Sequence, residues 1–322
     1  MTPPLEDDPQ AHTTWEPGSW EPVQSSFPAS SVPDPPLAPE FVPEPPAFLT
    51  ETHRPRLIPH LGHTVLFFVL AFIALLIGQG LGLFLIKQFH IFGHKTLNEL
   101  AAATQDDPRI SLPVQGLSYA LIALVVIPVF SVLWHEPFGA GIHWNASVAR
   151  RRFLFLALGG LACGFSIAIF GNFLPMPKDP PIMQDMMHSP LGAWMMLIFG
   201  VTIAPLLEEL AFRGFLLPGL VNGVRWLERE ELISTTAARF IGVPAAVFVT
   251  SLGFAFMHSG QVSHAWGPLV LIGGVSIVLC IVRLTLDSLA ASVIVHAAYN
   301  FTLFAGMIAA TGGFRHLEKL TT

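Results

Sequence analysis

Three charged side chains stand close together in an otherwise apolar stretch, residues 204–217, with the sequence APLLEELAFRGFLL. Each charge at the centre of a membrane helix costs about 2.5 to 3.5 kcal/mol on insertion scales, so Glu208, Glu209 and Arg213 need compensation or a function. Glu209 and Arg213 lie four residues apart, on one helix face, where a carboxylate and a guanidinium can pair. Glu208 is rotated by about 100° from Glu209 and is left without this partner. A carboxylate in an apolar cavity without a full partner suits a general base that activates water.

Polar side chains also interrupt two later apolar stretches at helical spacing. Phe254 and His258 lie four residues apart in FAFMHSG, and His296 and Asn300 lie four apart in HAAYN. The second pair puts two potential hydrogen-bond donors on one helix face, as stabilisation of an oxyanion requires. Taken alone, a histidine can bond a neighbouring backbone group, Asn300 can join two helices and Phe254 can pack in a core. Their coincidence with the two glutamates on three apolar segments favours a functional site.

These residues lie among apolar segments that are long enough to cross a membrane. A hydrocarbon core of roughly 30 Å requires about 20 mostly apolar residues per helix. The chain is 52% hydrophobic and 12% charged, with a mean hydropathy of +0.60. The sequence therefore predicts an all-α fold, a polytopic membrane helical bundle of about seven transmembrane helices. The predicted spans are residues 64–86, 114–134, 153–174, 190–217, 240–258, 266–282 and 288–311.

Residues 1–60 differ from the rest of the chain. They hold 15 of the 28 prolines and few clustered apolar residues, which predicts a disordered, Pro-rich and acidic tail. The net charge of -6 comes largely from this tail and gives no reason to expect a nucleic-acid partner. The excess of Lys and Arg on one set of loops, led by Arg150, Arg151 and Arg152, indicates a cytoplasmic N-terminus. In a bacterium the protein would lie in the plasma or inner membrane.

The segment between the fourth and fifth spans is neither apolar nor a simple loop. Trp226, Leu227 and Ile233 alternate there with charges, which predicts an amphipathic helix at the membrane interface. This arrangement contains a conflict. With straight spans, Glu208 late in 190–217 and His258 late in 240–258 would lie at opposite depths. Either the fifth span starts deep, or residues 218–239 partly re-enter the membrane, or a boundary is wrong, and we expect a wrong boundary.

The ordered set Glu-Glu-x-x-x-Arg at 208–213, Phe-x-x-x-His at 254–258 and His-x-x-x-Asn at 296–300 resembles the CPBP family. This family includes the type 2 CAAX prenyl proteases and the Abi proteins associated with bacteriocin immunity. The resemblance implies an intramembrane endopeptidase. In it Glu208 and His258 would activate the attacking water, and His296 and Asn300 would stabilise the tetrahedral oxyanion. The supporting residues would be Glu209, Arg213 and Phe254.

The resemblance covers about residues 150–311, which we expect to form the catalytic membrane domain. Two N-terminal transmembrane helices would occupy 61–149, and 312–322 would be a C-terminal tail. The expected partners are the lipid bilayer and a protein or peptide substrate, which can itself be membrane-anchored.

The cofactor requirement has two possible answers. The chain lacks the His-Glu-x-x-His spacing that places two zinc ligands on one helix face, so we expect no cofactor. The alternative is zinc bound by Glu208, His258 and His296 from different spans.

Two functions of other classes compete with proteolysis. A non-catalytic membrane scaffold, or an immunity- or secretion-associated binding protein, would use the polar cluster to pack helices or to bind a partner. A transporter or proton relay also places carboxylates and histidines inside the membrane, but the sequence shows no clear internal repeat.

Overall fold

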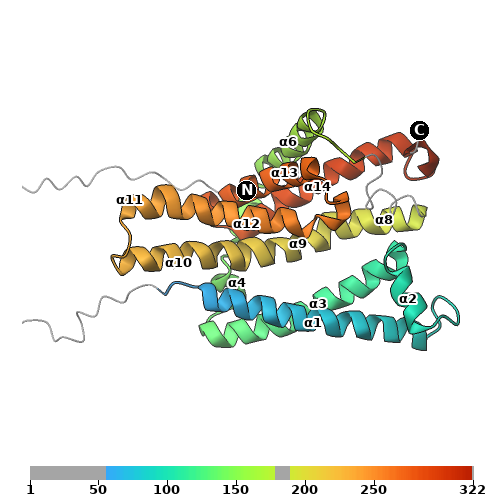
Figure 1. Cartoon of the computed structure of the whole chain (residues 1–322), viewed down its shortest axis with the longest axis horizontal. Helices are drawn as coiled ribbons and strands as arrows, with labels where there is room; N and C mark the ends of the chain where they lie inside the picture. Colours follow the sequence, from blue (N-terminus) through green and yellow to red (C-terminus); the bar gives the residue numbers. More distant parts are fainter. Residues whose placement is uncertain (1–55, 178–188, 321–322) are drawn as a thin grey trace, which may run out of the picture. The chain divides into compact units, whose positions relative to one another are not determined.

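The computed structural model describes residues 56–177 and 189–320, and this part of the chain is built from helices without strands (Figure 1). Seven helices in the described part are long and apolar enough to cross a membrane, which confirms the predicted number and the all-α class. The tail predicted to be disordered lies outside the described residues except for positions 56–60.

Five of the spanning helices are close to their predicted positions, with ends shifted by a few residues. These are α1 (Leu61–Gln88), α3 (Pro108–Trp134), α6 (Phe153–Gly171), α13 (Trp266–Leu286) and α14 (Leu289–Thr311). Short helices connect or follow them: α2 (Leu97–Ala103), α4 (Phe138–Gly141), α5 (Ala146–Arg151), η5 (Gly260–Val262) and η6 (Leu317–Leu320).

The fourth and fifth spans are longer than predicted and contain wide turns. The fourth consists of α8 (Pro190–Ile198), η2 (Phe199–Ile203), α9 (Ala204–Glu209), η3 (Leu210–Leu216) and α10 (Leu217–Arg229). The fifth consists of α11 (Thr235–Ala237), η4 (Ala238–Gly242) and α12 (Val243–Met257). Together they form a long hairpin (Figure 1).

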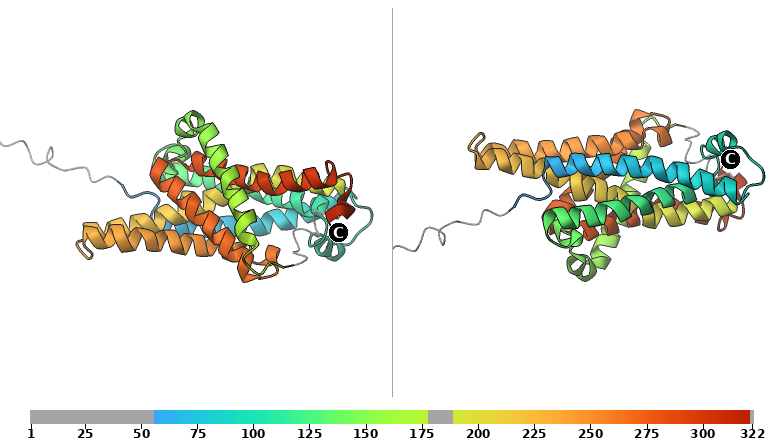
Figure 2. Two further views of the ribbon diagram at one scale, coloured as in Figure 1. Left: turned by 90° about the horizontal axis from the view of Figure 1, so that it is seen from above. Right: turned by 90° about the horizontal axis from the view of Figure 1, so that it is seen from below.

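The amphipathic segment predicted between these spans is not a separate helix, because its residues continue the fourth helix and begin the fifth. Part of its apolar face packs inside the bundle. Leu217 and Val221 of α10 are buried against Ala246 of α12, and α10 also lies against α1 (Figure 2). Leu217 and Val221 therefore meet protein, whereas Trp226 of the predicted pattern is 53% exposed. The charged residues follow where the hairpin turns.

The extension of the fourth helix removes the conflict over depth. Glu208 precedes Leu232, at the centre of the hairpin turn, by 24 residues, and His258 follows it by 26. Because the two arms are antiparallel, these side chains lie at the same level. The predicted end of the span at residue 217 was the error.

Close packing of α6 against α14 fixes the last helix of the bundle (Figure 2). Gly160 and Gly164 face it, and a Cβ atom at these positions would clash with Val295 and Thr302, respectively. Small residues spaced four apart allow helices to approach this closely in lipid. The register of α14, which carries His296 and Asn300, depends on this contact.

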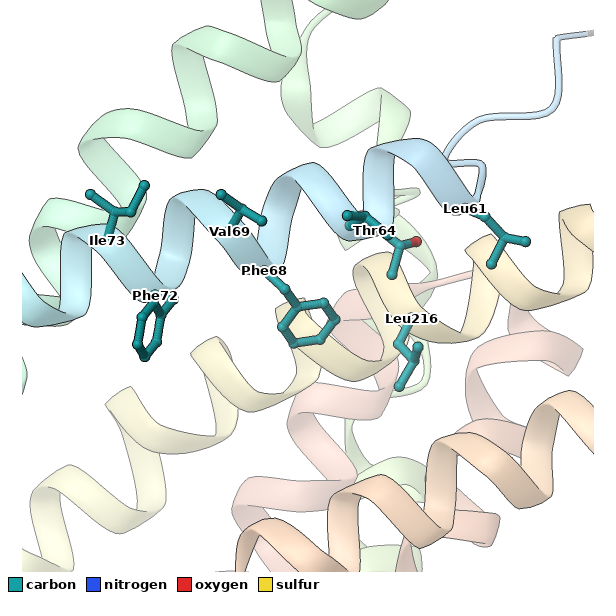
Figure 3. A pocket seen from close by; sticks show the side chains of 8 residues that line it. Leu61, Thr64, Phe68, Val69, Phe72, Ile73 and Leu216 are labelled. Atoms are coloured by element: carbon teal, nitrogen blue, oxygen red, sulfur yellow. The ribbon is translucent and has the colours of Figure 1, made fainter.

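An apolar groove of about 540 Å³ opens on the surface between α1 and the fourth helix (Figure 3). Side chains of α1 between Leu61 and Ile73 line it together with Leu216 of η3, and Thr64 is the one residue with a polar group among them. None of the predicted site residues lines this groove.

Candidate active site

Two π-helical turns, η2 and η3, flank the helical turn that carries both glutamates. A proline lies two residues beyond the end of each wide turn, Pro205 after η2 and Pro218 after η3. Proline has no N–H and its ring crowds the preceding turn, so a helix that continues through it must widen or kink. Wide turns of this kind frequently lie at functional sites.

The wide turn before Pro205 explains the position of Asn300. The Ala204 N–H bonds the carbonyl of Phe199 across this turn, and Pro205 has no N–H to offer the next carbonyl, that of Gly200. Asn300 of α14 donates its amide Nδ2 to the Gly200 oxygen at 2.7 Å instead. One of the two amide hydrogens of Asn300 is therefore committed to the backbone.

The wide turn before Pro218 explains a second buried side chain in the same way. The Leu217 N–H bonds the Phe212 carbonyl, and Pro218 leaves the Arg213 carbonyl without a backbone donor. Arg283 of α13, which is 4% exposed, donates its Nε to that carbonyl at 3.2 Å.

Arg283 connects this carbonyl to the end of the bundle where α13 and α14 meet. Its Nη1 donates to Asp287 at 2.9 Å, and His143 donates its Nδ1 to the same carboxylate at 2.8 Å. Burial opposes ionisation of Asp287, but the hydrogen bonds from His143 and Arg283 outweigh it and hold the pKa of this carboxyl below its usual value.

Glu208 faces two histidines from different helices. Its Oε2 atom lies 3.7 Å from Nε2 of His258 and 3.7 Å from Nε2 of His296. His258 follows α12 directly and donates its Nδ1 hydrogen to the Phe254 carbonyl at 2.8 Å. Since a carbonyl oxygen only accepts, the neutral ring has a bare Nε2, and that atom faces Glu208. The Glu208 and His258 side chains are each 15% exposed.

Glu209 has the opposite environment, because its side chain is completely buried and paired. Its Oε1 atom accepts from Arg213 Nη1 at 2.9 Å, the pairing that the spacing predicts, and from His296 Nδ1 at 2.9 Å. Arg213, also 0% exposed, donates Nη2 to the carbonyl of Ser276 at 3.0 Å and to its hydroxyl at 2.7 Å. Glu209 thus fixes the hydrogen of His296 on Nδ1 and turns its Nε2 toward Glu208.

Phe254 forms an aromatic wall between the two halves of this network. Its ring centre lies 4.6 Å from that of His258 and 5.7 Å from that of His296. The guanidinium carbon of Arg213 lies 4.6 Å from the same ring centre, a distance that suits a cation–π interaction. Phe254 therefore limits the movement of both histidines and shields the buried ion pair.

Three hydrogen-bond acceptors of this arrangement face one another. The Glu208 Oε2 atom lies 3.7 Å from each of the bare Nε2 atoms of His258 and His296, too far for direct hydrogen bonds. A water molecule, which donates two hydrogen bonds, can bridge such acceptors. In residues 56–177 and 189–320, no group of three or more His, Cys, Asp or Glu side chains is spaced to hold a metal ion. The expectation that no cofactor is needed stays a prediction.

The structure brings six of the seven predicted site residues into one network, and Asn300 joins it through the backbone of η2. Sequence reasoning missed Ser276 and Arg283, which bind the side chain and the carbonyl of Arg213. A serine in an apolar helix carries little signal. Pro218 was the available signal for Arg283, because a proline at this position leaves the Arg213 carbonyl, in the preceding turn, without a backbone donor.

Residues 190–302 match the family model described as Type II CAAX prenyl endopeptidase Rce1-like. The matched segment begins with α8, ends within α14 and includes all seven predicted site residues. The spanning helices α1, α3 and α6 precede it. No curated protein and no solved structure matches the chain.

Proposed function

The chain is a multi-pass membrane protein that carries a domain of the type II CAAX prenyl endopeptidase family, and we propose that it hydrolyses a peptide bond with water activated by Glu208 and His258. The observation that carries this proposal is the convergence of two imidazole Nε2 atoms on the Glu208 carboxylate, at 3.7 Å each. A general base must lie within reach of the water it deprotonates, and Glu208 and His258 face the same position.

The proposed reaction uses the water held by Glu208 and His258. The water oxygen forms a bond to the carbonyl carbon of the scissile peptide while Glu208 accepts the water proton. The tetrahedral intermediate then breaks its C–N bond, and the same proton passes to the departing amine. Shelter from bulk water strengthens each of these electrostatic interactions.

The oxyanion of the intermediate needs hydrogen-bond donors on the opposite side from Glu208. Asn300 retains one amide hydrogen beyond the one that it donates to Gly200. His296 can donate from Nε2 once that atom has taken a proton, and Glu209 stabilises the resulting imidazolium. These contacts support the roles that the family resemblance implies.

The proposed substrate is a protein or peptide held at the membrane, and a prenylated C-terminal peptide is the first candidate because the matched family is described by it. A cytoplasmic N-terminus would place Arg150, Arg151 and Arg152, directly before α6, on the cytoplasmic side.

The test is cleavage of a quenched fluorescent farnesylated peptide by the purified protein in detergent. The arms are the wild type, Glu208→Gln, and the wild type with a zinc chelator, with the unmodified peptide as a second substrate. Loss of cleavage in the variant alone supports metal-free chemistry. Loss in both supports zinc bound by Glu208, His258 and His296. Cleavage by Glu208→Gln at the wild-type rate would contradict the proposed role of Glu208.

A further inference from the structure

The two residues that the family resemblance assigns as oxyanion donors, His296 and Asn300, already donate hydrogen bonds to other groups in the resting protein. Asn300 gives one hydrogen to Gly200, and the hydrogen of neutral His296 lies on Nδ1, bonded to Glu209. At the start of the reaction His296 therefore presents an acceptor to the site. A further donor would let the substrate carbonyl be polarised before any proton moves.

Tyr119 of α3 lies beside the segment that carries these groups. Its ring stacks on Phe199 with 5.7 Å between ring centres and an interplanar angle of 28°. Phe199 is the first residue of η2 and directly precedes Gly200, the acceptor of the Asn300 amide. The helices α3 and α8 are in contact along this region (Figure 1). Tyr119 thus flanks η2 from α3, whereas Asn300 binds η2 from α14.

The hydroxyl of Tyr119 accepts a hydrogen bond, and its own hydrogen is not donated to another group of the described residues. Gln115, one turn earlier on α3, donates its Nε2 hydrogen to the phenol oxygen at 2.8 Å. The phenol keeps its single hydrogen for another acceptor. Within the described part of the chain, no side chain or carbonyl lies in position to take this hydrogen. Tyr119 and Leu207, the residue directly before Glu208, pack against the same buried cluster of apolar side chains.

We propose that Tyr119 is a catalytic residue that donates its phenol hydrogen to the carbonyl oxygen of the scissile peptide bond. The inference rests on the proposed function and names one further residue for it. Tyr119 precedes the segment 190–302 that the family model matches, so one of the first helices would complete the site. Gln115 is then a positioning residue, because its hydrogen bond orients the hydroxyl and makes it a better donor.

The matched variants are Tyr119→Phe and Tyr299→Phe, which remove the hydroxyl groups of the two tyrosines in the chain. Phenylalanine at 119 retains the ring that stacks on Phe199. With the farnesylated peptide, Tyr119→Phe should lower kcat about 100-fold and change KM by less than about twofold, since the donor acts mainly in the transition state. Tyr299→Phe should retain wild-type kcat.

A second measurement does not depend on turnover. The hydrate of a farnesylated peptide aldehyde resembles the tetrahedral intermediate, so Tyr119→Phe should weaken its inhibition about 100-fold but leave binding of the corresponding alcohol unchanged. Gln115→Met leaves the phenol in place and should lower kcat about fivefold, the loss expected for one hydrogen bond.

The results separate this inference from the function on which it rests. If Tyr119→Phe cleaves like the wild type while Glu208→Gln is inactive, the role of Tyr119 is refuted and the protease remains. A rise in KM with unchanged kcat would also overturn it, because Tyr119 would then contribute only to substrate binding. If the wild type cleaves no faster than Glu208→Gln, the proposed function and this inference fall together.

Discussion

The neighbouring carboxylates Glu208 and Glu209 of α9 differ in burial and in hydrogen bonding. On one side Glu209 is fully buried, and its Oε1 atom accepts hydrogen bonds from Arg213 and His296 at 2.9 Å each. On the other side Glu208 is 15% exposed, and its closest charged or titratable neighbours, the Nε2 atoms of His258 and His296, stay 3.7 Å away. Two consecutive residues thus carry a carboxylate that is paired with a cation and a carboxylate that has no bonded partner among the described residues.

This difference shows which of the two glutamates can react. A buried carboxylate is tolerated when a guanidinium and further hydrogen bonds satisfy it, and breaking such a pair destabilises the fold. A carboxylate without bonded partners contributes little to the fold and keeps its lone pairs for water. Substitutions on the Glu209 side should therefore act on stability, and substitutions on the Glu208 side should act on turnover.

The largest effect on stability should come from Arg213→Met. This change leaves Glu209 buried without its cation, which typically costs about 3 to 5 kcal/mol. Thermal unfolding in detergent should show the loss. Arg213→Lys keeps the charge but forms fewer hydrogen bonds. Its unfolding temperature should lie between those of Arg213→Met and the wild type. If Arg213→Met unfolded at the same temperature as the wild type, the ion pair would not stabilise the fold.

His258→Asn should produce the next effect, on turnover. Removal of a general base that shares the water with Glu208 should lower kcat/KM about 100-fold. The unfolding temperature should stay near that of the wild type, because this side chain is partly exposed. His264→Asn is the matched control, since His264 is exposed in the following turn and asparagine tolerates its φ of 56°. Equal activities of the two variants would remove His258 from the mechanism.

A smaller loss of stability is expected for Asn300→Leu, and it tests why Asn300 donates to the Gly200 carbonyl. Asn300→Leu leaves the Gly200 carbonyl without a donor and should cost about 1 to 3 kcal/mol of stability. Pro205→Ala restores an N–H that can reach this carbonyl, so Asn300→Leu should cost less than about 1 kcal/mol in that background. Additive losses in the double variant would show that the proline does not orphan the carbonyl.

The smallest effect should follow Ser276→Ala. Arg213 loses the hydroxyl acceptor at 2.7 Å but keeps the backbone carbonyl of the same residue at 3.0 Å. A loss of about 1 kcal/mol in unfolding free energy is expected, with cleavage within about threefold of the wild type. A loss as large as that of Arg213→Met would place the main support of the arginine on this hydroxyl.

The number of spans and the composition of the site could be predicted because they depend on local patterns. Long apolar runs define spans, and a spacing of four residues defines the pair of Glu209 and Arg213. The ends of the fourth span could not be predicted in this way. Its amphipathic end buries Leu217 and Val221 against another helix, and this burial depends on a tertiary contact.

Partners from distant helices were also beyond the reach of local patterns. Arg283 directly follows the predicted sixth span, 266–282, but it lies in the last turn of α13 and is buried against the Arg213 carbonyl. The contact between His296 and Glu209 joins residues 87 positions apart. Prolines in an apolar helix are a signal that can be used earlier, since Pro205 and Pro218 each predict an orphaned carbonyl that another helix must satisfy.

The most direct test of the difference between the two glutamates is to measure cleavage and unfolding on the same preparations of Glu208→Gln and Glu209→Gln. Glu208→Gln should lose at least about 1,000-fold in cleavage of the farnesylated peptide and unfold like the wild type. Glu209→Gln should unfold at a lower temperature, because Arg213 is left buried without its anion. If Glu208→Gln retained cleavage, or if it were the less stable of the two variants, the assignment of Glu208 as the base would be contradicted.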